Sequence, residues 1–344
     1  MSEETINIIL DELINKNGIN KLAKDLNIST GTIKRWKDLS HIPKQYLFQL
    51  MNLNNMKVLY SNFSYKDKDQ IFTPIETAQY CFKVFLKVIN KYNDNENQYT
   101  FIEPSAGCGN FLKVLPKNRT IAMDIEPRHT DVILQDYLYW KPPTNLKYIT
   151  FGNPPFGLRG QIALKFINHS AIFSDYVCFI LPQLFISDGK GAPRKRVKGL
   201  NLIHSEKINS TFYDPNNTEI KVNCIFQIWS KHHINVKYNI KKINTTILKV
   251  YSLSDGGSPS TTRNKKMFYK CDAYLPSTCF GKDTMKYYDS FEKLPRQKGY
   301  GIVFNIDKIN NIHKFKNIDW GSIAFLSTNS AYNIRTSQIV EQFI

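Results

Sequence analysis

Between residues 70 and 232 the sequence alternates short apolar runs with segments of helical periodicity. Each run is four to seven residues long, and most are rich in β-branched or aromatic residues, as β-strands are. Parallel strands need a long crossover, which a helix commonly supplies. The alternation therefore predicts an α/β domain built on a mostly parallel sheet. The runs occupy residues 99–102, 119–123, 146–150, 176–180 and 223–229.

Residues 1–57 have an all-helical pattern. Apolar residues recur at helical spacing from Ile6 to Ile14, and Gly18 ends that stretch. Residues 22–36 resemble the helix-turn-helix module of repressors, with Ser29 as N-cap of the second helix. A helix of this kind presents side chains to a DNA groove, here Thr30, Thr32, Lys34 and Arg35. A small helical domain that packs on an enzyme or on a partner would show the same pattern.

The remaining segments are a polar linker at 58–69 and a C-terminal region at 233–344. The C-terminal region is rich in aromatic residues, Lys, Gly and Ser and has no strong helical period. We therefore expect three domains: helices at 1–57, the α/β domain at 70–232, and a mixed, β-rich region at 233–344.

The chain is strongly basic. Lys and Arg number 46 against 29 Asp and Glu, giving a formal net charge of +17, and residues 231–344 hold 18 of the basic residues but only 8 of the acidic ones. Nucleic acid is the expected partner, because each neutralised phosphate releases a counterion. AT-rich coding, which favours Lys, Asn and Ile, would give a similar excess without any binding function.

Other features point to an intracellular protein. The six cysteines form no CxxC pair and do not lie near spaced histidines, so we expect neither disulfides nor a metal site. The acidic start Met1-Ser2-Glu3-Glu4 is no signal peptide, and no apolar run approaches about 18 residues. We therefore expect a cytoplasmic protein with no membrane contact.

The run at 99–102 leads into a Gly-rich turn that contains Gly107 and Gly109. Glycine allows positive φ and close approach of the backbone to a ligand. A phosphate-binding turn would avoid the carboxylate of Glu103, whereas a cationic ligand such as the ammonium group of S-adenosylmethionine would suit it. An ordinary turn is the alternative.

Two further carboxylates follow later runs. Asp124 lies about 20 residues beyond Glu103, where an acid of a Rossmann-like sheet commonly accepts hydrogen bonds from ribose hydroxyls. Asp136 and Tyr137 offer another acceptor and an aromatic wall for an adenine ring.

The third run is followed by Asn153-Pro154-Pro155-Phe156. The two prolines fix the backbone path, and their nitrogens cannot donate hydrogen bonds. Their carbonyls and the Asn153 side chain therefore become preset acceptors beside an aromatic ring. A proline turn without a function is the alternative.

Taken in order, these motifs resemble the S-adenosylmethionine-dependent DNA adenine-N6 methyltransferases. They resemble the γ arrangement, in which the cofactor motifs precede the Asn-Pro-Pro-Phe/Tyr motif and the target-recognition domain is C-terminal. The resemblance covers roughly residues 69–232, about half the chain, and rests on 69–74, 103–109, Asp124, 136–138 and 153–156. It implies a Rossmann-like domain, S-adenosylmethionine as cofactor and double-stranded DNA as partner.

The resemblance also implies roles for individual residues. Residues 72–74 would close over the methionine end of the cofactor, Glu103 would face its ammonium group, and Asp124 its ribose. Asp136 would accept from the cofactor adenine amine beside Tyr137. The implied cofactor set is Phe72, Thr73, Pro74, Glu103, Pro104, Ser105, Gly107, Gly109, Asp124, Ile125, Asp136, Tyr137, Asn153 and Pro155.

The catalytic residues implied by the resemblance are Asn153, Pro154, Pro155 and Phe156. Asn153 and the Pro154 carbonyl would bind the target amine, and Phe156 would stack on an adenine flipped out of the duplex. A second stacking aromatic is expected before the last hairpin, where Phe212 is our candidate and Tyr213 the alternative.

Two weaker patterns lie between the third run and the C-terminal region. The basic loop 188–199 could clamp phosphates through Arg194, Lys195 and Arg196, or could be a solvated loop. Asp214 with Glu219 and Lys221 imitates a nuclease signature, but the spacing is short and we expect a hairpin there.

The leading hypothesis is a site-specific DNA adenine-N6 methyltransferase that needs no metal. It would act as a monomer in DNA methylation, with any cognate restriction endonuclease encoded separately. The alternatives are methylation of RNA adenine or of a protein glutamine amide, and a DNA-binding regulator whose methyltransferase fold does not catalyse.

Overall fold

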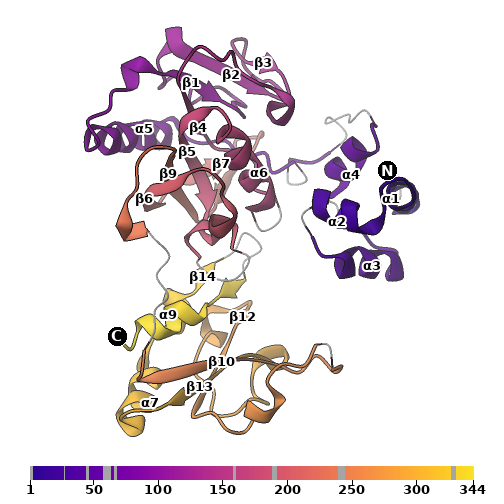
Figure 1. Cartoon of the computed structure of the whole chain (residues 1–344), viewed down its shortest axis with the longest axis vertical. Helices are drawn as coiled ribbons and strands as arrows, with labels where there is room; N and C mark the ends of the chain where they lie inside the picture. Colours follow the sequence, from indigo (N-terminus) through magenta and orange to yellow (C-terminus); the bar gives the residue numbers. More distant parts are fainter. Residues whose placement is uncertain are drawn as a thin grey trace.

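A computed structural model describes residues 3–26, 28–43, 46–56, 63–65, 68–157, 160–187, 192–238, 245–259, 261–326 and 331–344. Figure 1 shows a central α/β part, a helical N-terminal part beside it and a C-terminal part below. Much of the predicted linker and the start of the basic loop, 188–191, lie outside the described residues. Among the described residues, no helix is long and apolar enough to cross a membrane.

The N-terminal part consists of helices α1 (Glu3–Asn17), α2 (Ile19–Leu26), α3 (Thr30–Asp38) and α4 (Leu47–Leu53). Gly18 adopts a φ of +74°, which lets the chain turn between α1 and α2. Ser29 caps α3 as expected, because its side chain accepts a hydrogen bond from Thr32 N at 3.1 Å. Leu13, Leu22 and Ile33 are fully buried in the shared core.

The central part contains a seven-stranded sheet of order β3-β2-β1-β4-β5-β9-β6. All five predicted runs form strands. The strands β3 to β5 of this order are parallel, and β9 runs antiparallel to both of its neighbours, β5 and β6. The predicted α/β fold class is therefore confirmed. The strands are β1 (Thr100–Glu103), β2 (Thr120–Asp124), β3 (Ile133–Leu134), β4 (Tyr148–Gly152), β5 (Ser174–Pro182), β6 (Asn201–Ile208) and β9 (Cys224–Ser230).

Two helices, α5 (Ile75–Asn90) and α6 (Gln161–Ser170), pack against this sheet. Side chains alternate along each strand, so Phe101 packs in the cluster of α5 while its neighbour Ile102 packs in the cluster of α6. One expectation was wrong: only α6 links two of the parallel strands, and residues 104–119, 125–132 and 135–147 form turns and short 3-10 segments. Prolines and glycines in these connections oppose continuous helix.

The C-terminal part is mixed and rich in short strands. One sheet has the order β10-β13-β11 and a second the order β12-β15-β14, and Phe315, Trp320 and Ile302 are fully buried in their common core. The elements are β10 (Leu248–Ser254), β11 (Ala273–Pro276), β12 (Thr278–Cys279), β13 (Lys298–Phe304), α7 (Lys308–Asn317), α8 (Trp320–Ile323), β14 (Phe325–Leu326), β15 (Tyr332–Asn333) and α9 (Thr336–Glu341).

Candidate active site

A pocket lies at the carboxyl ends of the parallel strands β1, β2 and β4. Open α/β sheets bind ligands at this edge, because the loops that follow the strands meet there. Ten of the predicted site residues line it: Phe72, Thr73, Pro104, Ser105, Gly107, Asp124, Ile125, Tyr137, Asn153 and Pro155. Sequence reasoning missed others that line it, among them Lys68, Gln70, Asn110, Phe111, Glu126 and Phe166. Two of these, Asn110 and Glu126, directly follow the predicted positions Gly109 and Ile125.

Glu103 lies at the end of β1, beside the pocket, and is fully buried. Among the described residues, neither of its side-chain oxygens has a hydrogen-bond partner. Burial raises the pKa of the Glu103 carboxyl well above its usual range, and the nearby backbone N–H of Ser105 only partly opposes the rise. The packing around it is tight, since a Cβ on Gly152 would lie 2.7 Å from Glu103 Cδ. Burying a carboxylate without a partner costs free energy, so a bound cation or hydrogen-bond donor would stabilise it.

The Gly-rich turn uses its glycines to pack against neighbouring rings. Gly107 and Gly109 have φ values of +48° and +79°, which other residues rarely adopt. A Cβ on Gly107 would lie 3.0 Å from the Phe72 ring, and one on Gly109 would lie 2.8 Å from the His129 ring. The turn therefore holds Phe72 over its backbone.

Asp124 at the end of β2 braces that turn. Its Oδ2 accepts a hydrogen bond from Gly107 N and its Oδ1 accepts one from Glu126 N, both at 2.8 Å. Burial raises the pKa of Asp124, and these two hydrogen bonds partly oppose the rise. Each carboxylate oxygen has a further lone pair, so Asp124 can still accept from a ligand.

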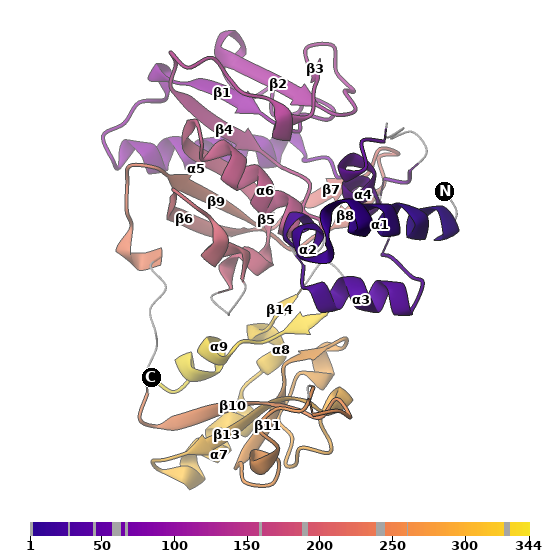
Figure 2. The same cartoon turned by 45° about the vertical axis from the view of Figure 1, so that its right-hand side comes forward.

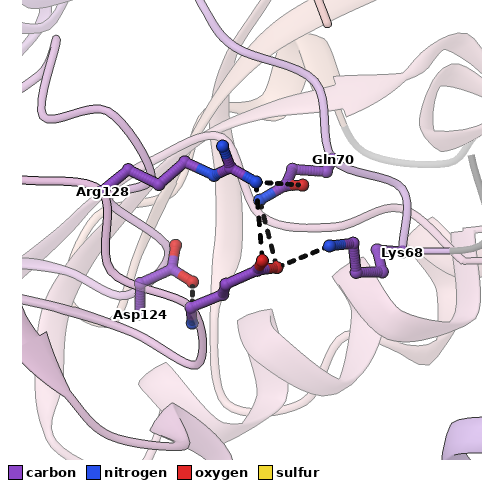
Figure 3. Close-up of polar contacts among 5 residues, drawn as sticks. Lys68, Gln70, Asp124 and Arg128 are labelled. Carbon is purple, nitrogen blue, oxygen red and sulfur yellow. Dashed lines mark hydrogen bonds and ion pairs between the residues drawn. The ribbon is translucent and has the colours of Figure 1, made fainter. Parts of the chain in front are cut away.

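Glu126 has a different set of partners, all from side chains (Figure 3). Its carboxylate accepts from Lys68 Nζ at 2.7 Å, from Gln70 Nε2 at 3.5 Å and from Arg128 at 3.5 Å. The Lys68 side chain is only 9% exposed, so this ion pair is shielded from water. Lys68 and Gln70 precede Phe72, and the network therefore ties the segment 68–73 to the end of β2.

The segment 68–73 also reaches the Asn-Pro-Pro-Phe turn. Asp69 Oδ2 accepts a hydrogen bond from Gly157 N at 2.6 Å, and Ile71 O accepts one from Asn153 Nδ2 at 3.4 Å. Phe72 pairs with Tyr213 through two backbone hydrogen bonds, of 2.7 and 3.0 Å. One short segment thus connects both halves of the pocket.

Asn153 has an acceptor that lacks a partner. Its Oδ1 is buried and accepts no hydrogen bond among the described residues. Because its Nδ2 donates to a carbonyl, the orientation of the amide is fixed by the hydrogen-bond network. Asn153 lines the pocket, and its own carbonyl accepts from Ser105 Oγ at 3.1 Å. The turn therefore offers a preset acceptor for a donor group.

Several predicted residues have structural roles in this conformation. Phe156 is 7% exposed, and its carbonyl accepts from Ile162 N and Ala163 N at the start of α6. Asp136 caps the 3-10 turn Tyr137–Tyr139 by accepting from Leu138 N at 3.0 Å. Pro74, Glu103, Gly109, Asp136, Pro154 and Phe156 do not form the pocket wall.

Tyr137 contributes to the pocket wall but its hydroxyl is engaged elsewhere. The Tyr137 hydroxyl shares a hydrogen bond with Ser170 Oγ at 2.7 Å, and its ring centroid lies 5.2 Å from that of Phe166. An aromatic wall is thus present at the place expected for an adenine ring.

The structure does not bring Phe212 to the pocket. Phe212 lies in strand β7 (Thr211–Tyr213), is 1% exposed and packs in the core cluster that contains Phe85 and Phe101. Strand alternation turns its neighbour Tyr213 the other way. The partner strand β8 (Glu219–Lys221) completes the expected hairpin, in which Asp214 accepts from Asn216 N and Thr218 N. Asp214 therefore shapes the turn.

The predicted DNA-binding residues lie in two places. On α3, Lys34 and Arg35 are exposed, whereas the Thr32 hydroxyl shares a hydrogen bond with the Ser29 hydroxyl at 2.9 Å. The second group, Arg194, Lys195 and Arg196, forms the 3-10 turn Pro193–Arg196 beside α6, where Arg196 donates to Gln161 Oε1 at 3.3 Å.

The helical part lies beside the sheet domain. Burial lowers the pKa of Lys165 on α6, and the nearby charge of Asp25 on α2 partly offsets this effect. The domain therefore approaches α6 through α2, and α3 remains a separate surface (Figure 2).

Substitutions of Asp69 test what positions the turn at residues 153–156, which we call the acceptor turn. Asp69 has a φ of +51°, which Asn and Gly tolerate well. We expect Asp69→Gly, which keeps that conformation but loses the acceptor for Gly157 N, to lower kcat roughly tenfold. Asp69→Asn, which keeps an acceptor, should stay within about threefold of the parent. Steady-state kinetics measures both, and equal losses in the two variants would contradict the role.

No protein-family model matches this sequence, and no curated protein matches it. Among solved structures, it is similar to a Pyrococcus horikoshii protein described provisionally as an RNA methyltransferase, with 16% identity over 47% of this chain and 86% of that chain and a TM-score of 0.35.

Two other structures show similar values. The 23S rRNA methyltransferase ErmE is 14% identical over 47% of this chain and 69% of its own, with a TM-score of 0.33. A provisionally described methylase from Haemophilus influenzae is 12% identical over 46% of this chain and 99% of its own, with a TM-score of 0.30. TM-scores this low support no inference about a shared activity or substrate. The activity is therefore argued from the residues of the site alone.

Proposed function

We propose that the protein transfers a methyl group from S-adenosylmethionine to the N6 amine of adenine in DNA. The observation that carries the proposal is a pair of buried acceptors lacking partners among the described residues, Asn153 Oδ1 in the pocket wall and the Glu103 carboxylate directly before the lining residue Pro104. The first suits a cation and the second suits an amine. Their order along the chain is that of the motifs the sequence resembles.

The residues present fit the proposed cofactor. Glu103 would bind its ammonium group, and Asp124 would accept from ribose hydroxyls through its remaining lone pairs. Phe72, held over Gly107, would cover the methionine end. When bound, S-adenosylmethionine supplies an electrophilic methyl group on a sulfonium. Acidic side chains around the pocket favour such a positively charged ligand.

The acceptor turn accounts for activation of the amine. The lone pair of an adenine amine is delocalised into the ring, which makes the nitrogen a weak nucleophile. Asn153 Oδ1 and the Pro154 carbonyl would accept its two hydrogens and favour a tetrahedral nitrogen. These acceptors bind the developing positive charge more strongly than the ground state, and that difference lowers the barrier. The contacts of Asp69 and Ile71 hold the turn in place.

Nucleic acid is favoured as the substrate by charge and by the N-terminal helices. The net charge is +17, and α3 presents Lys34 and Arg35 to solvent after a regular N-cap. A helix-turn-helix pattern beside the catalytic domain favours DNA over RNA adenine or a protein glutamine amide. A regulator without catalysis would have no use for the Asn153 acceptor.

One experiment separates these substrates. The protein is incubated with methyl-labelled S-adenosylmethionine and either duplex DNA, RNA or cell protein, and the products are digested and identified. We expect N6-methyladenine in DNA. Label found only in RNA or in glutamine would refute the DNA assignment, and no label in any product would refute catalysis.

A further inference from the structure

The C-terminal part carries a basic projection that none of the site residues explains. It leaves β10, spans residues 255–270 and returns before β11; we call it the finger. It contains four cationic residues and one acidic residue, Asp255. The cations are Arg263, Lys265, Lys266 and Lys270, and all four are exposed.

These cations have no anionic partner within the described part of the chain. None of the four takes part in an ion pair there. The one acid of the finger is used by its own turn, because Asp255 Oδ1 accepts from Gly257 N at 3.2 Å and from Thr262 Oγ1 at 3.3 Å. The positive charge of the finger is therefore available to an outside anion.

The base of the finger is held firmly. Ser254 and Arg263 are paired by backbone hydrogen bonds of 2.7 and 3.3 Å, and Asn264 Nδ2 donates to Ser252 O at 2.7 Å. Phe268 stacks on Phe291 with centroids 3.8 Å apart, and its carbonyl accepts from Tyr274 OH at 2.6 Å. A fixed scaffold loses little conformational entropy when its cations bind a ligand.

The cationic surface continues around the base of the finger. Asp255 N donates to Gln297 O at 3.0 Å, and Ser254 lies opposite Lys298 in the β10–β13 register. Arg296 and Lys298 are both exposed at this place. The side chain of Tyr269 is 80% exposed among these charges, which adds a ring to a surface of cations. Glu292, which accepts from the Tyr269 hydroxyl, is a nearby acid.

The finger projects on the same side of the molecule as the N-terminal helices. In both views it lies below α3, whereas α5 lies on the opposite side of the sheet domain (Figures 1 and 2). A duplex that contacts the exposed Lys34 and Arg35 of α3 would thus approach the finger.

We propose that the finger binds the phosphate backbone of a nucleic-acid duplex. The proposal rests on the proposed function for its biological setting but needs no methyl transfer. A backbone contact of this kind gives affinity and register without reading sequence. Duplex DNA and duplex RNA share this polyphosphate chemistry, so the test uses both.

The test compares two triple variants with the same change of charge. The finger variant carries Arg263→Gln, Lys265→Gln and Lys266→Gln. The control carries Lys83→Gln, Lys87→Gln and Lys91→Gln, which remove two exposed lysines of α5 and the exposed lysine at its C-cap. Binding to a 24-base-pair DNA duplex, to the RNA duplex of matching sequence and to a scrambled DNA duplex is measured from 50 to 200 mM salt, without cofactor.

We expect the finger variant to bind DNA more weakly and to lower the slope of log K against log salt by about three, one per phosphate contact. The loss should be equal on the scrambled duplex, and the control should lower the slope by less than about one. If the finger variant loses affinity for the RNA duplex but not for the DNA duplex, the finger binds the RNA backbone. The proposal is overturned if both variants behave alike, or if the parent binds no duplex. A finger-dependent binder that methylates nothing would refute only the proposed function.

Discussion

Replacing Asn153 with alanine is expected to lower kcat by about 10²- to 10³-fold, which is the usual loss when one preorganised transition-state contact is removed. Asn153 Oδ1 is buried without a partner, so the alanine variant removes an acceptor that the fold itself does not use. The bond from Asn153 Nδ2 to Ile71 O is long, at 3.4 Å, and its loss should affect stability little. Affinity for S-adenosylmethionine should therefore change by only a few-fold.

A second pocket asparagine provides the control. Asn110 Nδ2 donates to Thr73 O at 2.9 Å, on the cofactor side of the pocket. Asn110→Ala should loosen residue 73 and raise the KM for the cofactor, with kcat reduced less than in Asn153→Ala. Initial rates at varied cofactor and DNA concentrations separate the two effects. An Asn153→Ala enzyme with parental kcat would refute the acceptor role.

The sequence predicts the sheet well because buried parallel strands are short and apolar. All five expected runs form strands, since each has enough β-branched and aromatic residues to be buried on both faces. It does not predict β3, which is only Ile133–Leu134, or β6, whose partly exposed polar positions hide its pairing with β9. The prediction of helices between the parallel strands is mostly wrong, because prolines and glycines in these connections favour turns over helix.

The sequence predicts a site residue when its residue type alone suggests the role. It does not predict a residue whose role depends on contacts with residues far away in the sequence. Glycines, prolines and acids at strand ends are visible in the sequence, and four of the nine predicted ones line the pocket: Pro104, Gly107, Asp124 and Pro155. The bond from Gly157 N to Asp69 and the ion pair of Lys68 with Glu126 join positions 88 and 58 residues apart, which spacing alone does not reveal. Phe212 was expected at the pocket, but one position of strand alternation turns it into the core.

We expect the Glu103 carboxyl to make the folded protein more stable at low pH than at high pH, whereas an acid in an ion pair has the opposite effect. Because burial raises its pKa in the folded state, folding favours the protonated form. This contribution is fully present below the ordinary pKa of a glutamic acid and is lost as the pH rises towards the raised folded value. Glu103→Gln should remove that loss, so the variant without cofactor should melt at a higher temperature than the parent at pH 8, with a smaller difference at pH 5.

The same substitution should weaken binding of S-adenosylmethionine by roughly 10- to 100-fold, since it replaces an ionic hydrogen bond with a neutral one. An ammonium group beside Glu103 favours the carboxylate, so binding by the parent should release a proton wherever Glu103 is protonated in the free protein. Calorimetric titration in buffers of different ionisation enthalpy measures that proton, and the variant should not release it. If Glu103→Gln leaves both the affinity for S-adenosylmethionine and the proton release unchanged, Glu103 does not face the cofactor. If the variant is more stable but binds the cofactor as tightly as the parent, Glu103 is a buried acid with no role in binding.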